Sequence, residues 1–575
     1  MSEENEAPAV PLVNVQIDGK WHRFPKGTRM IEAIHSIGTE VPHYCYHPKL
    51  SSPGNCRMCM VEMGMPPRLA PGQKPDLDAQ GRPKNIGWMP RPVISCANTV
   101  AEGMGIRTKG EFVETVRGGV MEFLLANHPL DCPICDQAGE CSLQEYSVEH
   151  GKGGSRFEEQ KVKKPKNVEI GERITLDDER CIMCSRCVRF CDEVLEDHVL
   201  GFTDRGSHTT LDVHPGKRFD SNYSLNTVDI CPVGALTSND FRFQMRVWFL
   251  KETDTIDVNC GTGANITVWT RSDEIYRITP RENNEVNSSW MPDSHRLAFH
   301  QYAKELRLTS PLVKEGRQHR VATQAESVRY AGALLQSLDG DQIAVVASAR
   351  MTNEELFLAS RLVKALGVKN FDVVPREGES DGLLISSDRN PNTMGAQLLF
   401  LGKQTPGSKL SAIRKGIGSG KIKAVLALGE DLLTPEAGFT KAQLGKLDFL
   451  LQAHIVANPT ADLAQVVLPG AIFAEKRGSM INVTGRIQRL NKALEPLGQA
   501  CDDWEILRDL IASVGGGNGI YLLEELFKQM TTEVPELAGL TLGRIGDQGL
   551  PLIETKVGIP MLQKEAERRA SGAIS

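Results

Sequence analysis

Alternating apolar and polar residues predict a β-hairpin close to the start of the chain. The runs VNVQI and KWHRF flank an Asp-Gly dipeptide at residues 18–19, which suits a type I′ turn. A short helix is expected over residues 30–37, where apolar side chains share one face and Thr28 can cap the first turn. A longer helix is predicted over residues 111–127, because the apolar residues there follow a 3.6-residue period.

The pattern changes at about residue 250. Three short β-rich runs, at residues 343–348, 424–429 and 449–457, alternate with helical stretches such as residues 353–366. Alternation of this kind favours an α/β fold with a mainly parallel sheet. The second half of the chain is therefore expected to differ in fold class from the first half.

Length and charge narrow the class of protein. A chain of 575 residues is too long for a single core and should form roughly three or four domains. The formal net charge of −7 argues against a general nucleic-acid binder. No apolar run approaches the ~18 residues that span a bilayer, and the acidic start MSEENEAPAV lacks the features of a secretory signal. We therefore expect a soluble, intracellular protein, which could still dock on a membrane complex through protein contacts.

Cysteine is the most informative residue type. Twelve of the 14 cysteines lie before residue 232. An extracellular disulfide framework fits poorly with a long chain that lacks an export signal and uses tight C-x-x-C spacings. Such spacings in a reducing compartment bind metal or carry out redox chemistry.

The first candidate ligand set is Cys45, Cys56, Cys59 and Cys96. The stretch CYHPKLSSPGNCRMC places three thiols in one loop, after a hairpin and a helix, which is the order of a β-grasp [2Fe–2S] ferredoxin. Cys96 supplies the fourth thiol, because no other cysteine precedes the next set. A Pro- and Gly-rich surface insertion is expected before it, at residues 64–92. A zinc site with a free core thiol is the alternative.

The second candidate set is His128, Cys132, Cys135 and Cys141, in the stretch HPLDCPICDQAGEC. Compact Cys₃His sets also bind zinc, so the spacing alone is ambiguous. Its position between two other cluster motifs favours a [4Fe–4S] cluster. A neutral imidazole in place of an anionic thiolate should change the reduction potential of that cluster.

The third candidate set is Cys181, Cys184, Cys187 and Cys231. The run CIMCSRCVRFC has the C-x2-C-x2-C-x3-C spacing of bacterial ferredoxins, in which the fourth cysteine of each run ligates the other cluster. The second run is marked by Cys231-Pro232, but its three other positions hold hydroxyl residues, which are poor iron ligands. These positions are Ser221, Ser224 and Thr227.

The third set therefore predicts a two-cluster module in which one site has been lost. Cys191 would have served the lost site and is interpreted as an orphan buried thiol. The competing assignment for the surviving [4Fe–4S] cluster uses Cys191 in place of Cys231.

Two cysteines remain after these assignments. A further C-x2-C-x3-C set would require thiols at 257, 260 and 264, where the chain has Asp257, Cys260 and Ala264, so no fourth cluster is expected. Cys501 is isolated and is interpreted as a core or free thiol.

The ordered motifs resemble the 75-kDa-type iron–sulfur subunits of NADH–quinone oxidoreductase, respiratory complex I, which are the G-type subunits in bacteria. The resemblance is carried by PHYCYHPKLSSPGNCRMCMVE, NHPLDCPICDQAGECSLQ, RCIMCSRCVRFC and DICPVGALTS, and more weakly by LPGAIFAEKRGSMINVTGRIQ. It implies an electron relay that accepts electrons from a flavin subunit oxidising NADH. The electrons then pass to a downstream ferredoxin-like subunit and to quinone. The resemblance also implies a peripheral position on the cytoplasmic side of the inner membrane, within a membrane complex.

The resemblance and the motifs together predict an α+β first half followed by an α/β, molybdopterin-oxidoreductase-like second half. We expect a β-grasp [2Fe–2S] domain over residues 1–105 and a His-Cys₃ [4Fe–4S] module over 106–150. A [4Fe–4S] ferredoxin-like module with one degenerate site should follow over 168–250. The remainder, residues 251–575, should form the α/β domain without a metal ligand.

Three other functions were weighed. A formate-dehydrogenase-like enzyme would need a thiol or comparable molybdenum ligand after the helix at 353–366, where the chain reads NFDVVPREGES. We therefore expect no molybdopterin and no independent substrate site. The diaphorase arm of an NAD-reducing hydrogenase uses related modules but is disfavoured by the long second half. A zinc-stapled scaffold does not explain three thiols in one loop. The chain also lacks a G-x-G-x-x-G fingerprint and a P-loop, so direct NADH binding is not expected.

Overall fold

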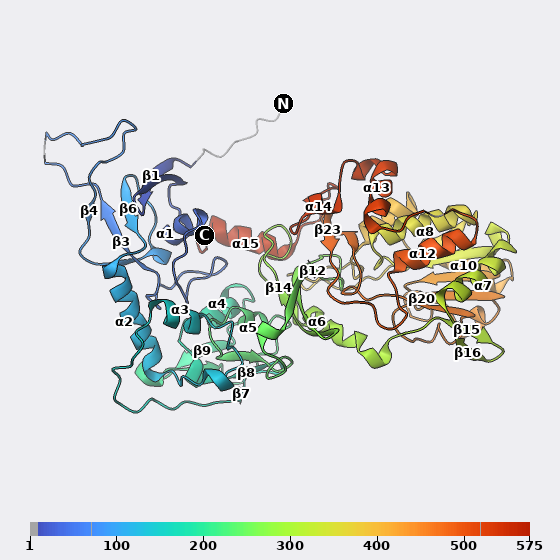
Figure 1. Cartoon of the computed structure of the whole chain (residues 1–575), viewed down its shortest axis with the longest axis horizontal. Helices are drawn as coiled ribbons and strands as arrows, with labels where there is room; N and C mark the ends of the chain where they lie inside the picture. Colours follow the sequence, from blue (N-terminus) through green and yellow to red (C-terminus); the bar gives the residue numbers. More distant parts are fainter. Residues whose placement is uncertain (1–9, 71, 518, 575) are drawn as a thin grey trace. The chain divides into compact units, whose positions relative to one another are not determined.

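The computed structural model describes residues 10–70, 72–517 and 519–574. The chain forms two compact units (Figure 1). The first unit runs up to Phe249 and also includes the segment that begins at Glu565, and the second unit is Leu250–Lys564. Within the described residues, no helix combines the length and apolar character needed to cross a membrane.

The first unit begins with a mixed sheet in the order β2-β1-β6-β3-β4. Its strands are β1 (Leu12–Ile17), β2 (Lys20–Pro25), β3 (Met60–Met65), β4 (Gly87–Trp88) and β6 (Met104–Arg107), and β5 (Val93–Ile94) pairs with β3. The predicted hairpin is confirmed: β1 and β2 pair antiparallel, and Asp18 and Gly19 have φ angles of 47° and 84°. Helix α1 (Met30–Ser36) packs its apolar face on this sheet.

Instead of one large sheet, the rest of the first unit has helices, 3-10 helices and short strands that are joined by loops. The helices are α2 (Glu111–Asn127), α3 (Ser142–His150), α4 (Arg186–Glu193), α5 (Asn226–Asp229) and α15 (Pro560–Ala570), whose last turns lie in this unit. The short 3-10 helices at the cysteine loops are η1 (Ser95–Ala97), η2 (Cys132–Ile134) and η3 (Asp178–Arg180). The small sheets are β7 (Val168–Glu169), β8 (Ile174–Leu176) and β11 (Leu236–Ser238), and the pair β9 (Leu200–Thr203) and β10 (Thr210–Val213).

The second unit is built around a seven-stranded sheet in the order β16-β15-β21-β20-β19-β17-β18. Its strands are β15 (Leu312–Glu315), β16 (Gln318–Val321), β17 (Ile343–Ala347), β18 (Asn370–Val373), β19 (Ala424–Leu428), β20 (Phe449–His454) and β21 (Val466–Pro469). The five strands from β21 to β18 are parallel, as the three β-rich runs predicted.

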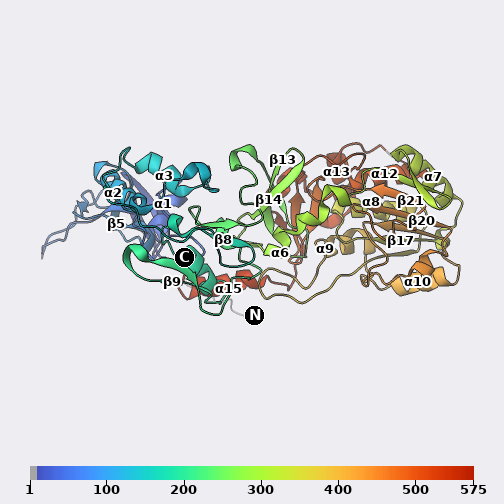
Figure 2. The same cartoon turned by 90° about the horizontal axis from the view of Figure 1, so that it is seen from below.

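Helices cover both faces of this sheet (Figure 2). One apolar core holds Val345 of β17 together with α7 (Gln324–Gln336), α8 (Asn353–Ala365), α12 (Asp503–Ser513) and α13 (Leu523–Glu533). The core on the other face holds Val346 together with α10 (Leu410–Gly418) and α11 (Lys441–Leu444). Because both faces are covered, the strands are apolar at nearly every position.

Two smaller sheets flank the large one in sequence. The first is antiparallel and consists of β12 (Lys251–Ile256), β13 (Asn265–Arg271) and β14 (Glu274–Pro280), followed by helix α6 (Asp293–Arg296). The second consists of β22 (Gly478–Ile481), β23 (Arg486–Leu490) and β24 (Leu550–Pro551). The short helices α9 (Thr393–Ala396) and α14 (Leu542–Ile545) complete the second unit.

Candidate metal centres

Strand pairing brings Cys96 to the loop of the first set. Strand β5 pairs with β3 in the register Met60↔Ile94, which places Ser95 opposite Cys59. The Ser95 N–H and hydroxyl both donate to the Cys59 carbonyl, at 3.0 and 2.9 Å. The long segment between Cys59 and Cys96 is thereby closed, with Cys96 buried in η1.

The four thiols of the first set form one connected group. A hydrogen bond with Cys45, together with burial, raises the pKa of the Cys56 thiol. A hydrogen bond with Cys96 lowers the pKa of Cys59, and Cys96 also interacts with Cys45. The loop turns at Arg57, whose φ of 62° is left-handed, a conformation that side-chain-bearing residues keep only under constraint.

The second set lies in the loop between α2 and α3. His128 is the C-cap of α2 and Cys141 is the N-cap of α3, while Cys132 and Cys135 bracket η2. Burial is the main cause that raises the pKa of Cys141 to about 11, and the Cys135 and Cys132 thiols contribute to the same rise. The structure thus brings the three thiols of this set together.

The imidazole of His128 is held in a form that can ligate metal. Burial lowers the pKa of His128 to about 4, so the ring is neutral at physiological pH and keeps a free lone pair. The ring lines a cavity of 180 Å³ whose wall also includes Cys181. The Lys161 ammonium donates to the His128 carbonyl at 2.7 Å and fixes the backbone at this position.

The third set lines a single small cavity. Cys181, Cys184, Cys187 and Cys231 all contribute to its wall, and Phe202 and Leu211 of the β9–β10 hairpin are apolar members of the same wall. Cys191 is fully buried in α4 and is not among the lining residues. This geometry favours Cys231 over Cys191 as the fourth member of the set.

Backbone N–H groups point at the thiols of the third set. The N–H groups of Met183 and Arg186 hydrogen-bond to the Cys181 and Cys184 thiols. Met183 and Ser185 are both left-handed, with φ of 54° and 61°. Successive N–H groups that converge in this way form a concavity that suits an anion, and a cluster ligated by thiolates is anionic.

All three sets contribute to one apolar core. Its buried members are Tyr44, Cys45, Met58, Met121, Cys141, Leu143, Cys184, Val233 and Ala235, and its half-buried members include Cys56, Cys181 and Cys231. The second and third sets also meet directly, because a Cβ on Gly234 would lie 2.4 Å from the Cys135 Sγ. The cysteine loops are therefore neighbours in a shared dry environment.

Two arginines, the buried Arg189 and the half-buried Arg186, join the first and third loops. Arg189 donates to the carbonyl of Cys45 at 2.5 Å and also to that of Ser51. Arg186 donates to the carbonyls of Tyr46 at 2.5 Å and Ile230 at 3.0 Å. A planar guanidinium bridges several carbonyls at once, so these contacts fix the position of one loop against the other.

A single zinc ion would require closely spaced ligand atoms. Zn–S bonds of about 2.3 Å in a tetrahedron bring ligand sulfurs to about 3.8 Å from one another. Among the described residues, the only group of three or more His, Cys, Asp or Glu ligand atoms lying within 4.8 Å of one another is Asp257, Cys260 and His295. The three predicted sets are not among the groups that meet this criterion in the described part of the chain.

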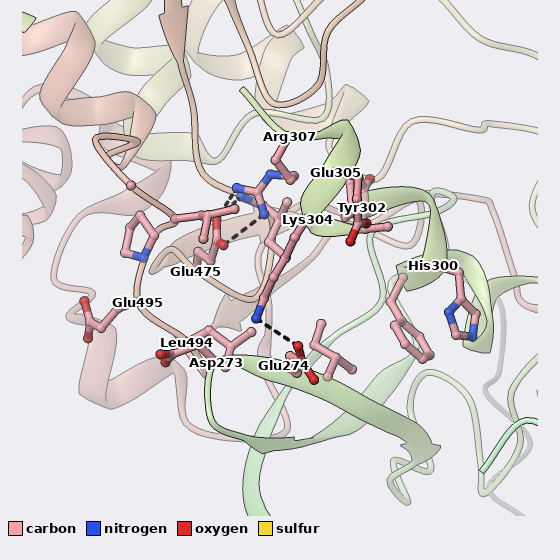
Figure 3. Close-up of a pocket in the computed structure, with 17 residues that line it drawn as sticks. Asp273, Glu274, His300, Tyr302, Lys304, Glu305, Arg307, Glu475, Leu494 and Glu495 are labelled. Atoms are coloured by element: carbon pink, nitrogen blue, oxygen red, sulfur yellow. Dashed lines mark hydrogen bonds and ion pairs between the residues drawn. The ribbon is translucent and has the colours of Figure 1, made fainter. Parts of the chain in front are cut away.

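The second unit contains a pocket of 440 Å³ beside the β13–β14 turn (Figure 3). Its two basic side chains are already paired: Lys304 with Glu274 at 2.9 Å, and Arg307 with Glu475 at 2.9 and 2.6 Å. The other charged lining residues are carboxylates, namely Asp273, Glu305 and Glu495. The acidic surplus disfavours a phosphate-bearing ligand, which would need free cationic partners.

Several residues of these sites were not found by sequence reasoning. Arg180 binds Asp131 at 3.1 and 2.7 Å and so connects the loop of the second set to the start of the third. Gly234 allows the close approach to Cys135. His295 lies beside Asp257 and Cys260 although it comes 35 positions after Cys260 in the sequence. None of these carries a local motif, and the adjacency of Arg180 to Cys181 is the one available signal.

Models of known families match along most of the chain. A 2Fe-2S iron-sulfur cluster binding domain matches residues 11–111, and the NADH-ubiquinone oxidoreductase-G iron-sulfur binding region matches 117–156. The NADH-quinone oxidoreductase subunit 3 ferredoxin-like domain matches 171–237, and a related 4Fe-4S domain matches 250–300. Molybdopterin oxidoreductase matches 389–513. The predicted fold class and its order along the chain are thereby confirmed.

Curated relatives match over nearly the full length. The G-type subunit of NADH-quinone oxidoreductase from Rickettsia felis is 29% identical over 92% of this chain and 92% of its own. The NADH-ubiquinone oxidoreductase 78 kDa subunits of Neurospora crassa and Candida albicans are 30% and 31% identical, over 88% and 87% of this chain and 81% and 82% of theirs. Among solved structures, a NAD+-reducing [NiFe]-hydrogenase chain is 27% identical, covering 41% of this chain and 91% of its own, with a TM-score of 0.34.

Proposed function

The chain belongs to the family of the G-type subunits of NADH-quinone oxidoreductase and the NADH-ubiquinone oxidoreductase 75–78 kDa subunits, and from this premise we propose that it relays electrons through three iron–sulfur clusters. The observation that carries the proposal is the apolar core that contains thiols of all three ligand sets. A relay needs its redox centres near one another and shielded from water, and a shared core supplies both conditions. The chain is thus a subunit of an oxidoreductase complex.

We assign one [2Fe–2S] cluster to Cys45, Cys56, Cys59 and Cys96. One [4Fe–4S] cluster is assigned to His128, Cys132, Cys135 and Cys141, and another to Cys181, Cys184, Cys187 and Cys231. When bound, such clusters take up and release single electrons without making or breaking a substrate bond. The connected thiols of the first set and the common cavity of the third support these assignments.

The protein's own residues tune and separate the sites. N–H groups of residues such as Met183 and Arg186 donate to ligand sulfurs, and hydrogen bonds of this kind stabilise the more negative, reduced state. Phe202 and Leu211 exclude water from the third site. The neutral His128 gives the second site one negative charge fewer than four thiolates would. Arg189 holds the first and third loops in a fixed relation.

We propose that the chain works inside a respiratory complex, peripheral to the membrane on its cytoplasmic side. Its partners would be a flavin subunit that oxidises NADH, a downstream ferredoxin-like subunit and the quinone module. Family membership supports these partners, because the relatives are named as subunits of NADH-quinone and NADH-ubiquinone oxidoreductases.

The second unit is proposed to have no substrate site of its own and to bind no molybdopterin. The pocket beside the β13–β14 turn has an acidic surplus, and both of its basic side chains are already paired with carboxylates. A cofactor that carries phosphate would find no free cationic partner there. The molybdopterin-type fold of this unit would then serve to hold partners rather than to catalyse.

Metal analysis of the anaerobically purified full chain tests the relay. We expect about ten irons and a matching amount of acid-labile sulfide per chain, from one binuclear and two tetranuclear clusters, without molybdenum. Reduction should produce electron paramagnetic resonance signals from both cluster types. Zinc in place of iron at the three sets would overturn the redox function. Molybdenum near one per chain would favour an enzyme instead.

A further inference from the structure

A compact group of three potential metal ligands lies in the second unit, outside the sets assigned above. Asp257 follows strand β12, Cys260 lies three residues later, and His295 belongs to helix α6. One ligand atom from each lies within 4.8 Å of the other two. All three residues are buried, with exposed fractions of 2%, 1% and 8%.

Neighbouring residues fix the orientation of the group. The His295 Nδ1 lies 2.6 Å from one Asp257 carboxylate oxygen. The other oxygen accepts hydrogen bonds from the Asn259 backbone and side-chain N–H groups, at 3.1 and 2.6 Å. Asn259 also donates to the His295 carbonyl at 3.4 Å, so one side chain aligns both residues. Metal ligands are commonly oriented by such outer contacts.

The backbone around the group is closely packed. A Cβ on Gly261 would lie 2.4 Å from a Val483 side-chain carbon, so only glycine fits beside Cys260. The Thr262 hydroxyl donates to the Leu384 carbonyl at 2.6 Å, and the Cys260 Sγ lies 3.8 Å from that carbonyl oxygen. The fold therefore encloses the three donors tightly and leaves His295 as the most exposed of them.

We propose that Asp257, Cys260 and His295 bind one zinc(II) ion. One sulfur, one nitrogen and one oxygen donor suit a borderline cation and not Mg²⁺ or Ca²⁺, which require oxygen ligands. The thiolate and the carboxylate carry two negative charges, which balance a dication, so the loaded site is neutral and tolerates burial. An oxygen ligand such as water completes a tetrahedral set.

Binding is an exchange of the metal for protons. The zinc ion displaces the proton of the Cys260 thiol and the proton shared by His295 and Asp257, and both protons leave to solvent. The site falls within the segment that matches a 4Fe-4S domain, residues 250–300, where Cys260 is the one remaining cysteine. With one cysteine, this segment lacks the ligands for a cluster and is inferred to hold a single ion instead.

X-ray absorption at the zinc edge of the full, iron-loaded chain tests the site directly. We expect about one zinc per chain, with one sulfur at about 2.3 Å and the remaining ligands nitrogen or oxygen at about 2.0–2.2 Å. Cys260→Ser should remove the sulfur shell, and His295→Gln should lower the zinc content. Cys501→Ser is the matched control, because it removes the other cysteine of the second unit and should leave both readings unchanged.

Three results would overturn the site. The first is a chain that holds about ten irons but no zinc above background. The second is zinc bound by three or four sulfurs, which would mark misloading of the cluster sets. The third is about fourteen irons, which would mean that residues 250–300 hold a fourth cluster. Because the iron count is read separately, failure of the zinc site leaves the relay itself untouched. The zinc content and X-ray absorption of the unmodified chain decide the outcome, so the test holds even if a variant does not fold.

Discussion

The ferredoxin-like region contains two segments, 40 residues apart in sequence, that have the same spacing of key residues before a helix. One segment has thiols at these positions and the other has hydroxyls. Cys181, Cys184 and Cys187 precede and enter helix α4, and Ser221, Ser224 and Thr227 occupy the equivalent places before and within helix α5. Cys187 and Thr227 are each the second residue of their helix. The two segments therefore compare a loop that carries thiols, and is proposed to bind a cluster, with one that carries hydroxyls.

The backbone differs where the side chains differ. Ser185 is left-handed with φ of 61°, whereas Leu225 at the equivalent position is right-handed with φ of −64°. The N–H groups of the first loop hydrogen-bond to thiols. In the second loop, the Ser224 and Thr227 N–H groups donate to carbonyls three residues earlier, each at 3.0 Å.

The hydroxyl loop satisfies its own polar groups. The Thr227 hydroxyl donates to the Ser224 carbonyl at 2.8 Å, and both residues are fully buried. The cysteine loop instead lines a cavity, and its Met183 and Arg186 N–H groups hydrogen-bond to the Cys181 and Cys184 thiols. The difference teaches that the two loops differ in backbone conformation as well as in their candidate ligands.

The largest effect is expected from the ligands themselves. Cys184→Ser should remove the cluster of the third set, about four of about ten irons, and stop electron transfer through the chain. Cys191→Ser, in the same helix–loop segment, should leave the iron content unchanged, because Cys191 does not line the cavity. Iron analysis and electron paramagnetic resonance measure both. Loss of a cluster in Cys191→Ser would show that the ligand assignment is wrong.

A smaller effect is expected where the second and third sets touch. Gly234→Ala places a methyl group 2.4 Å from the Cys135 Sγ. Overpacking of this kind costs about 1–3 kcal/mol and should weaken the iron signal of the second set. Gly201→Ala is the control, because nothing lies within 4 Å of its Cβ. Thermal unfolding and iron content should separate the two variants, and equal behaviour would contradict the contact.

The smallest effect is expected from restoring thiols to the lost site. The triple variant Ser221→Cys, Ser224→Cys, Thr227→Cys should keep about ten irons after reconstitution, although Cys191 is also present. The reason is that this loop follows right-handed turns and directs its N–H groups to carbonyls. The unmodified chain, reconstituted in parallel, is the reference. A rise to about fourteen irons would mean that thiols alone determine the site.

Local sequence patterns predicted the helices and turns that are determined by residues close together in the chain. The hairpin at Asp18 and Gly19, helix α2 and helix α8 lie where periodicity placed them, within about one residue. The prediction that Thr28 caps the first helix is wrong: Arg29 is the N-cap, and the Thr28 hydroxyl donates to the Pro25 carbonyl at 2.8 Å. The helix begins one residue later than a Thr28 cap requires, and a boundary shift of that size cannot be read from sequence alone.

Contacts between distant segments could not be predicted in this way. The spacing of the cysteines identified the loops, but the β3–β5 register that delivers Cys96 is a long-range pairing. Strand β3 ends inside the segment interpreted as an insertion, residues 64–92, and β5 begins directly after that segment. Within the segment, Gly87 and Trp88 form strand β4. The meeting of Asp257 and Cys260 with His295 likewise depends on tertiary structure, because no periodic pattern links these positions.

The last turns of helix α15 belong to the first unit but are translated long after the rest of that unit. Glu565 accepts a hydrogen bond from the buried Lys49 ammonium at 3.0 Å, and Arg568 pairs with Glu193. These partners leave the ribosome only after the whole intervening second unit, residues 250–564, has been translated. The segment that carries the cysteine sets thus emerges hundreds of residues before its own last helix can dock. The contacts that α15 makes with Lys49 and Glu193 are therefore among the last to form in the first unit.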